Sequence, residues 1–138
     1  MPIPFIDLQA QRQRLGQPLE DAILKVVRSG AWIMGPEIAE LEKALGEFGE
    51  APFVLSCGSG TEALQLPLMA WGIGPGDAVF CPSFSFAATA EVMPLVGASP
   101  VFVDVRPDTF TLDPERLEAA IVAVKAAGRL TPRAIMGV

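Results

Sequence analysis

Short apolar runs alternate with helix-like stretches from residue 53 onward, and this alternation constrains the fold more than any other feature of the chain. The apolar runs predict strands at 53–55, 78–81, 100–105 and 133–138. The stretches between them predict helices at 60–71, 86–96 and 114–127, the last with Asp113 as its N-cap. Strands that alternate with helices form a parallel sheet covered on both faces. The sequence therefore predicts an α/β fold with a mostly parallel sheet and flanking helices.

Two further helices are predicted before the first of these strands. Apolar residues recur at helical spacing from Leu19, and this helix is expected to end near Gly30. Pro36, a favoured first helical residue, opens the next one. The loop between them is apolar and has a glycine at each end. We therefore divide the chain into residues 1–35, an N-terminal helix and loop, and residues 36–138, part of a larger α/β domain.

The composition excludes several classes of function. A net charge of −6, with only ten basic residues, argues against nucleic acid or an anionic membrane as a partner. The sequence has no histidine and no Cys-x-x-Cys pair, so zinc and imidazole chemistry lack their usual residues. Cys57 and Cys81 lie at the ends of apolar runs, which predicts small buried thiols. With no signal-peptide pattern and no apolar run of about 18 residues, a cytoplasmic location is expected.

The segment Ser-Cys-Gly-Ser-Gly-Thr-Glu-Ala-Leu at 56–64 carries the clearest functional signal. It joins a predicted strand to a predicted helix through glycines. The first turn of a helix offers unpaired N–H groups and the positive end of the helix dipole. A phosphate is therefore expected at Gly60 and Thr61, without help from a lysine or arginine. Glu62, in the same turn, is expected to be structural, because a carboxylate is favourable there.

Other interpretations of this segment are open on the residues alone. Gly58 to Ala63 match the Gly-x-Gly-x-x-Ala fingerprint of dinucleotide-binding folds, but no acidic residue follows strand 78–81 to hold a ribose. The glycines are also compatible with a tight turn that binds nothing. Phe84 and Phe86, in the loop after strand 78–81, are suited either to stacking on a flat cofactor or to packing in the core.

Six blocks of sequence, taken together, point to a family. They are Phe-Ile-Asp-Leu at 5–8, Trp-Ile-Met-Gly-Pro-Glu at 32–37, the segment 56–64, Gly-Ile-Gly-Pro-Gly-Asp at 72–77, and the segments 82–91 and 96–105. In this order they resemble the N-terminal part of the DegT/DnrJ/EryC1/StrS family of pyridoxal-phosphate-dependent nucleotide-sugar aminotransferases. The resemblance implies part of the large domain of a fold type I enzyme that acts as a homodimer.

The resemblance also implies an activity and roles for individual residues. The expected reaction moves an amino group from an amino acid, usually glutamate, to a nucleotide-linked keto-sugar, in amino-sugar or cell-surface polysaccharide biosynthesis. The expected cofactor is pyridoxal 5′-phosphate. Gly60 and Thr61 match the phosphate-binding positions, and Phe86 matches the aromatic position that stacks on the pyridine ring. The loop that matches the sugar-nucleotide entrance contributes Trp32, Met34 and Gly35.

The catalytic residues of the family are expected outside this chain. The Schiff-base lysine, and the aspartate that pairs with the pyridinium nitrogen, match positions after Val138. The lysines of this chain, Lys25, Lys43 and Lys125, fall on polar faces of predicted helices, so the chain alone is expected to be inactive. Pro67 departs from the family pattern and predicts a kink or an early end in the helix that begins at Gly60.

Two alternative functions remain open on the sequence. The same scaffold resembles sugar 3-dehydratases, in which a histidine replaces the lysine at a position beyond Val138. The other alternative is a truncated, non-catalytic paralogue that binds a phosphate ligand or a partner subunit, because the phosphate-binding segment is present without a catalytic lysine.

Overall fold

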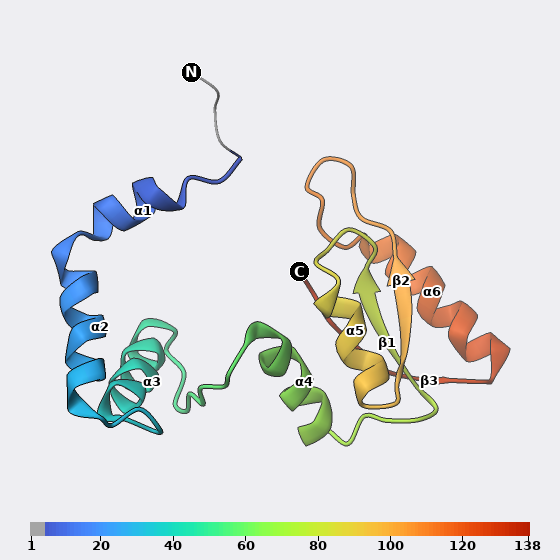
Figure 1. Cartoon of the computed structure of the whole chain (residues 1–138). Helices are drawn as coiled ribbons and strands as arrows, with labels where there is room; N and C mark the ends of the chain where they lie inside the picture. The colour runs from blue at the N-terminus through green and yellow to red at the C-terminus, as the bar shows by residue number, and fades with distance from the viewer. Residues whose placement is uncertain (1–4) are drawn as a thin grey trace. The chain divides into compact units, whose positions relative to one another are not determined.

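A computed structural model describes residues 5–138, which fall into two units divided between Ser56 and Cys57 (Figure 1). The first unit contains the helices α1 (Leu8–Leu15), α2 (Gln17–Ser29) and α3 (Pro36–Phe48). The second unit contains α4 (Gly60–Ala70), β1 (Asp77–Pro82), α5 (Ala88–Leu95), β2 (Ser99–Val103), α6 (Pro114–Ala127) and β3 (Thr131–Ile135).

The second unit is built on a three-stranded parallel sheet with the order β2-β1-β3. Phe80 of the central strand β1 lies opposite Val101 of β2 on one side and Ile135 of β3 on the other. Helix α5 connects β1 to β2, and α6 connects β2 to β3. The structure therefore confirms the predicted α/β fold, with a parallel sheet and flanking helices.

Alternate residues of β1 face two different helical layers. Val79 and Cys81 belong to the core cluster that includes residues of α4 and α5. Ala78 and Phe80 belong to the cluster on the opposite face, where residues of α6 pack against them. All four side chains are buried. A strand covered on both faces has a continuous apolar sequence rather than an alternating one. This explains why the sequence alone predicts β1.

Most predicted elements form within two residues of their expected bounds. Helix α6 begins at Pro114 as predicted, because Asp113 Oδ1 accepts hydrogen bonds from the N–H groups of Glu115 and Arg116, at 2.9 and 3.3 Å. The last strand begins and ends earlier than predicted, at Thr131–Ile135 rather than 133–138.

The strand predicted at 53–55 does not form. Residues 53–55 are irregular, and the side chains of Phe53 and Leu55 are 91% and 84% exposed. A strand is held by hydrogen bonds to a neighbouring strand. Among residues 5–138, no strand pairs with this segment, so its apolar character alone does not order it.

Helix α4 does not end early at Pro67. It continues to Ala70, although proline lacks the N–H group that would bond to the carbonyl of Ala63. Helix α5 likewise contains Pro94 one residue before its end. Both helices pack against each other. Tertiary packing therefore outweighs the local cost of each proline.

The first unit confirms two predicted helix bounds and adds one helix. Helix α2 ends at Ser29 and is followed by Gly30 in the left-handed conformation, with φ of 69°, and α3 begins at Pro36. Lys25 Nζ of α2 and Glu37 Oε1 of α3 form an ion pair at 3.2 Å. Helix α1 was not predicted, because its apolar residues show little helical periodicity, and Asp7 caps its first turn.

In the part of the chain that the structure describes, no helix is suited to cross a membrane. The longest helix there, α6, has 14 residues, whereas a span needs about 20.

Candidate functional site

The N-terminus of α4 is closed by a reciprocal pair of hydrogen bonds. Ser59 is the N-cap, and its Oγ accepts a hydrogen bond from the N–H of Glu62 at 3.2 Å. Glu62 Oε2 in turn accepts one from the N–H of Gly58 at 2.6 Å. This is a capping box in which the glutamate reaches the residue before the N-cap. Glu62 is therefore structural, as predicted.

This capping pair leaves the N–H groups of Gly60 and Thr61, which we call the cradle, without an acceptor among residues 5–138. Gly60 is exposed, and a Cβ added to it would meet no heavy atom within 4 Å. The two donors lie at the positive end of the helix dipole. Such a helix end fits a phosphate group.

The loop after β1 holds Phe84 and Phe86 in different surroundings. The Phe84 ring contacts the ring of Phe110, with centroids 5.7 Å apart and planes inclined at 44°. The Phe86 side chain, by contrast, is 80% exposed. Phe86 is therefore the more exposed of the two residues, and the one that makes no contact with another aromatic ring among residues 5–138.

The cradle and Phe86 lie at the same end of the sheet. Helices α4 and α5 pack against each other, and both run opposite to β1 (Figure 1). Their N-termini therefore lie at the carboxyl end of β1, the edge at which parallel α/β sheets bind ligands. The cradle begins α4, and Phe86 comes two residues before α5.

The loop 30–35 belongs to the first unit, so the structure describes it separately from the cradle. Met34 has φ of 50°, in the left-handed region that residues with a side chain rarely adopt. Gly35 is buried, and a Cβ at this position would lie 2.3 Å from the carbonyl oxygen of Ala31. Trp32 and Met34 are 70% and 77% exposed. The loop thus has a defined backbone from which large apolar side chains project.

Cys57 differs from its prediction, whereas Cys81 agrees with it. Cys57 is exposed, because the strand expected just before it does not form, and its Sγ donates to the carbonyl of Ser59 at 3.4 Å. Cys81 is buried, and burial raises the pKa of its thiol. Among residues 5–138, no three acidic or cysteine side chains are grouped to hold a metal ion.

None of the three lysines of the chain is buried, as a desolvated and neutral amine would be. Lys25, Lys43 and Lys125 are all exposed on helices. A hydrogen bond to Glu37 raises the pKa of Lys25, which opposes the neutral amine that Schiff-base formation requires. Lys43 pairs with Glu47 at 3.8 Å, one helical turn away. The expectation that the covalent step needs a residue from elsewhere stays a prediction.

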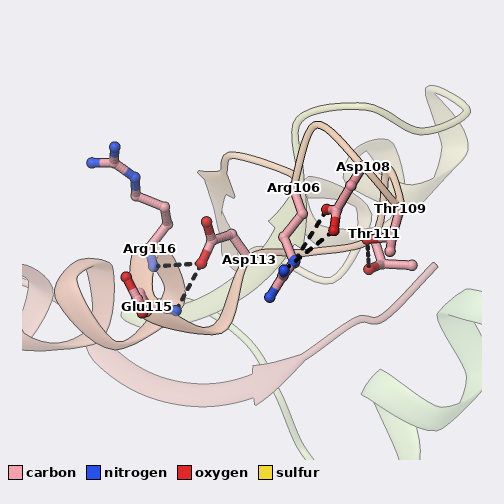
Figure 2. A network of polar contacts seen from close by, with 7 residues as sticks. All are labelled: Arg106, Asp108, Thr109, Thr111, Asp113, Glu115 and Arg116. Atoms are coloured by element: carbon pink, nitrogen blue, oxygen red, sulfur yellow. Dashed lines mark hydrogen bonds and ion pairs between the residues drawn. The ribbon is translucent and has the colours of Figure 1, made fainter.

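A hollow of about 510 Å³ at the loop between β2 and α6 does not suit an anion. It is lined by Arg106, Pro107, Asp108, Asp113, Pro114 and Glu115. The Nε and Nη2 atoms of Arg106 already donate to the Asp108 carboxylate, at 3.2 and 3.3 Å (Figure 2). The remaining charges in the hollow are carboxylates, so the cradle is the better phosphate site.

Comparison with known proteins decides the family. The model of the DegT/DnrJ/EryC1/StrS aminotransferase family matches residues 13–138. The chain belongs to this family. It is 50% identical over 119 residues to the UDP-2-acetamido-2-deoxy-3-oxo-D-glucuronate aminotransferase of Pseudomonas aeruginosa, an alignment that covers 86% of this chain and 33% of that protein.

Two solved structures resemble this DegT-family chain. A DegT DnrJ EryC1 StrS aminotransferase from Brucella abortus has a TM-score of 0.93 and 58% identity, over 99% of this chain and 36% of that one. NtdA from Bacillus subtilis, solved with bound cofactor PMP, has a TM-score of 0.85 and 28% identity, over 99% and 30%. The chain thus spans about a third of the length of these relatives, and its fold is part of a fold type I domain.

Two contacts of this DegT-family chain involve residues that were not predicted as part of the site. Phe110 packs on Phe84, and Thr89 Oγ1 lies 2.7 Å from Ser85 Oγ, with which it shares a hydrogen bond. The spacing of Ser85 and Thr89, one helical turn, is a weak sequence signal for their contact. Phe110 gives no such signal, because its partner lies in another loop.

Proposed function

We propose that this chain forms the phosphate-binding part of a pyridoxal-phosphate-dependent aminotransferase, which transfers an amino group from an amino acid to a nucleotide-linked keto-sugar. The family match over residues 13–138 is the observation that carries the proposal. The name of the P. aeruginosa relative, a UDP-linked 3-oxo-sugar aminotransferase, supports the substrate class. The bound PMP of NtdA supports the cofactor. Glutamate is the proposed amino donor.

The cofactor, when bound, would supply the electron sink that amino-group transfer requires. Gly60 and Thr61 would donate their backbone N–H groups to its phosphate, and the helix dipole would add to the attraction. Because these donors belong to a capped helix end, they are oriented before the ligand arrives. Phe86 would cover one face of the pyridine ring and keep water away from that face.

The remaining parts of the proposal concern the substrate and the assembly. Trp32, Met34 and Gly35 are proposed to line the entrance for the sugar nucleotide, since their loop presents apolar side chains on a defined backbone. A homodimer, a cytoplasmic location and a place in amino-sugar or polysaccharide biosynthesis complete the proposal. The proposed domain division, residues 1–35 and 36–138, separates this entrance loop from the cofactor-binding part.

The proposal assigns binding and orientation, but not the covalent step, to the residues of this chain. The exposed lysines and the ion-paired Lys25 are unsuited to that step. We place the Schiff-base lysine, and the aspartate that pairs with the pyridinium nitrogen, in sequence after Val138 of a longer protein. The aminotransferase names of the relatives reported above favour transamination over the 3-dehydratase alternative.

Gly60→Pro tests the cradle directly. Proline removes the N–H donor but is favoured at the first position of a helix, so α4 should still form. Ser59 already has an extended backbone, which the residue before a proline prefers. Gly60→Ala is the matched control, because it keeps the N–H and its Cβ would enter open space.

The measurement is the dissociation constant of pyridoxamine 5′-phosphate, compared with that of pyridoxamine, by titration calorimetry on the 138-residue chain. We expect the phosphorylated ligand to bind more tightly to the wild type and about tenfold more weakly to Gly60→Pro. Gly60→Ala should resemble the wild type. Equal affinity for both ligands, or equal behaviour of the two variants, would contradict the proposal.

A further inference from the structure

The loop that carries Phe86, residues 83–87, is tethered on both sides of that residue. On one side, the N–H of Ser83 donates to the carbonyl of Val103 in β2, at 2.8 Å. On the other, Thr89 of α5, a residue only 5% exposed, shares its 2.7 Å hydrogen bond with Ser85 and donates its N–H to the carbonyl of Phe86 at 3.0 Å. The exposed ring of Phe86 therefore projects from a backbone that is held in place.

A residue of a separate loop makes a third contact with the 83–87 loop. Phe110 lies in the β2–α6 hairpin, which we define as residues 104–113, and its ring packs on that of Phe84. The two side chains are 59% and 65% exposed. Because both residues remain more than half exposed, their contact orders the loop rather than filling the hydrophobic core.

The backbone of the β2–α6 hairpin is closed by its own hydrogen bonds. The N–H of Arg106 donates to the carbonyl of Thr111, and the N–H of Phe110 donates to the carbonyl of Arg106, both at 2.9 Å. Nearer the sheet, the N–H of Asp113 donates to the carbonyl of Asp104 at 3.0 Å. These hydrogen bonds therefore fix the backbone of the hairpin that carries Phe110.

Side chains reinforce the hairpin around Phe110 (Figure 2). The Arg106 guanidinium pairs with the Asp108 carboxylate, and the hydroxyls of Thr109 and Thr111 lie 2.8 Å apart. Phe110 itself has φ of 58°, in the left-handed region. A bulky residue is unfavourable in this conformation, so it persists only where its surroundings hold it. These contacts therefore hold the Phe110 ring in place.

We propose that Phe110 is a positioning residue for Phe86: by holding Phe84, it fixes the 83–87 loop so that the Phe86 ring presents its face to the ring of an aromatic phosphate ligand. The inference rests on the proposed function. It concerns the ring of the ligand and not its phosphate, because the cradle donors belong to a different element, α4. Loss of the Phe110 ring should therefore change the preference between ligands.

The experiment compares two ligands, pyridoxamine 5′-phosphate and inorganic phosphate, on four forms of the full chain. The forms are the wild type, Phe110→Ala, Phe110→Tyr and Phe102→Ala. Phe102 is the matched control, since it is 60% exposed but lies on β2 rather than in either loop. Circular dichroism establishes that each form is folded, and titration calorimetry gives the two dissociation constants.

In Phe110→Ala, we expect pyridoxamine 5′-phosphate to bind about two- to tenfold more weakly, as loss of an aromatic contact predicts. Inorganic phosphate should bind as to the wild type. Phe110→Tyr keeps the ring and should restore the wild-type preference, and Phe102→Ala should not change it. If Phe110→Ala does not fold, Phe84→Ala serves instead and should show the same selective loss.

The other outcomes overturn the inference in distinguishable ways. An unchanged preference in folded Phe110→Ala, or in Phe84→Ala where it replaces that variant, would overturn the positioning role alone, and so would an equal loss for both ligands. If the wild type binds inorganic phosphate as tightly as pyridoxamine 5′-phosphate, ring stacking is absent, and the proposed function fails together with this inference.

Discussion

The carboxylate of Glu62 lies 2.6 Å from the backbone nitrogen of Gly58 and so occupies one of the donors at the N-terminus of α4. This bond completes the cap that Ser59 begins, and it also places a negative charge within the glycine segment that ends in the cradle. The same residue thus stabilises the helix that forms the proposed site and opposes, by repulsion, the anion that would bind there.

Ser59→Ala should lower the free energy of unfolding by about 1 kcal/mol, because it removes the N-cap acceptor of the Glu62 N–H. Urea denaturation followed by circular dichroism measures the effect. Ser99→Ala is a useful comparison, because Ser99 begins the strand β2 and caps no helix. Equal effects of the two substitutions would argue against the cap.

Glu62→Gln should raise the affinity for inorganic phosphate. The amide keeps an oxygen that can accept from the Gly58 N–H, while one negative charge near the cradle is lost. The gain should shrink as salt is added, since screening weakens interactions between exposed charges. Phosphate titrations at low and high ionic strength measure both effects. An affinity that does not change at low salt would show that this carboxylate has no electrostatic influence on the cradle.

Gly35→Ala should destabilise the first unit. The added Cβ would lie 2.3 Å from the carbonyl oxygen of Ala31, so the loop backbone must move. Overpacking of this kind costs about 1–3 kcal/mol, and thermal unfolding measures it. Gly60→Ala, whose Cβ enters open space, is the control. If both variants unfold at the wild-type temperature, the close approach at Gly35 does not constrain the loop.

Local chemistry explains which parts of the fold were predictable from sequence. Asp113 with the following proline, and Gly30 with its left-handed conformation, mark helix ends through interactions within a few residues. The apolar run of β1 likewise predicts a strand that is covered on both faces. The segment 53–55 has a similar composition, but a strand also needs a neighbour, and composition cannot supply one.

The candidate site likewise has a part that local sequence predicts and a part that depends on distant residues. The helix end at Gly60 and Thr61 was predictable, because both residues follow their N-cap directly in sequence, and phosphate binding there stays a prediction. The different roles of Phe84 and Phe86 were not, because they depend on Phe110, whose ring arrives from a loop more than twenty residues away. The exposure of Cys57 was missed for a related reason: it follows from the absence of a strand at 53–55.

Ile135→Lys should reduce self-association of the chain. Among residues 5–138, β3 pairs with β1 alone, so its other edge presents unpaired backbone groups. Ile135 is 54% exposed on this strand. Val122→Lys is the matched control, since Val122 is 59% exposed but lies on α6. Sedimentation velocity over a range of concentrations measures association, and a wild type that stays monomeric throughout would contradict the prediction.

Acid should destabilise the first unit through Glu42. Its Oε1 accepts hydrogen bonds from the N–H of Ser56 at 2.9 Å and from the Ser56 hydroxyl at 2.8 Å. The backbone bond, followed by the hydroxyl bond, lowers the pKa of Glu42 from its ordinary value of 4.5. A carboxyl group whose pKa is lower in the folded state stabilises that state at pH above its unfolded pKa. The stabilisation is lost as the pH falls from 4.5 through the lower folded value.

Two variants separate this contribution from the general effect of acid. In Glu42→Gln, which does not titrate, the free energy of unfolding should be lower than in the wild type near neutral pH, and the difference should shrink as the pH falls below 4.5. Ser56→Ala should keep most of the wild-type pH dependence, because the larger of the two causes is the backbone N–H, which alanine retains. Urea denaturation at several pH values tests both. A constant difference between wild type and Glu42→Gln would show that the hydrogen-bonded carboxylate is not the group that titrates.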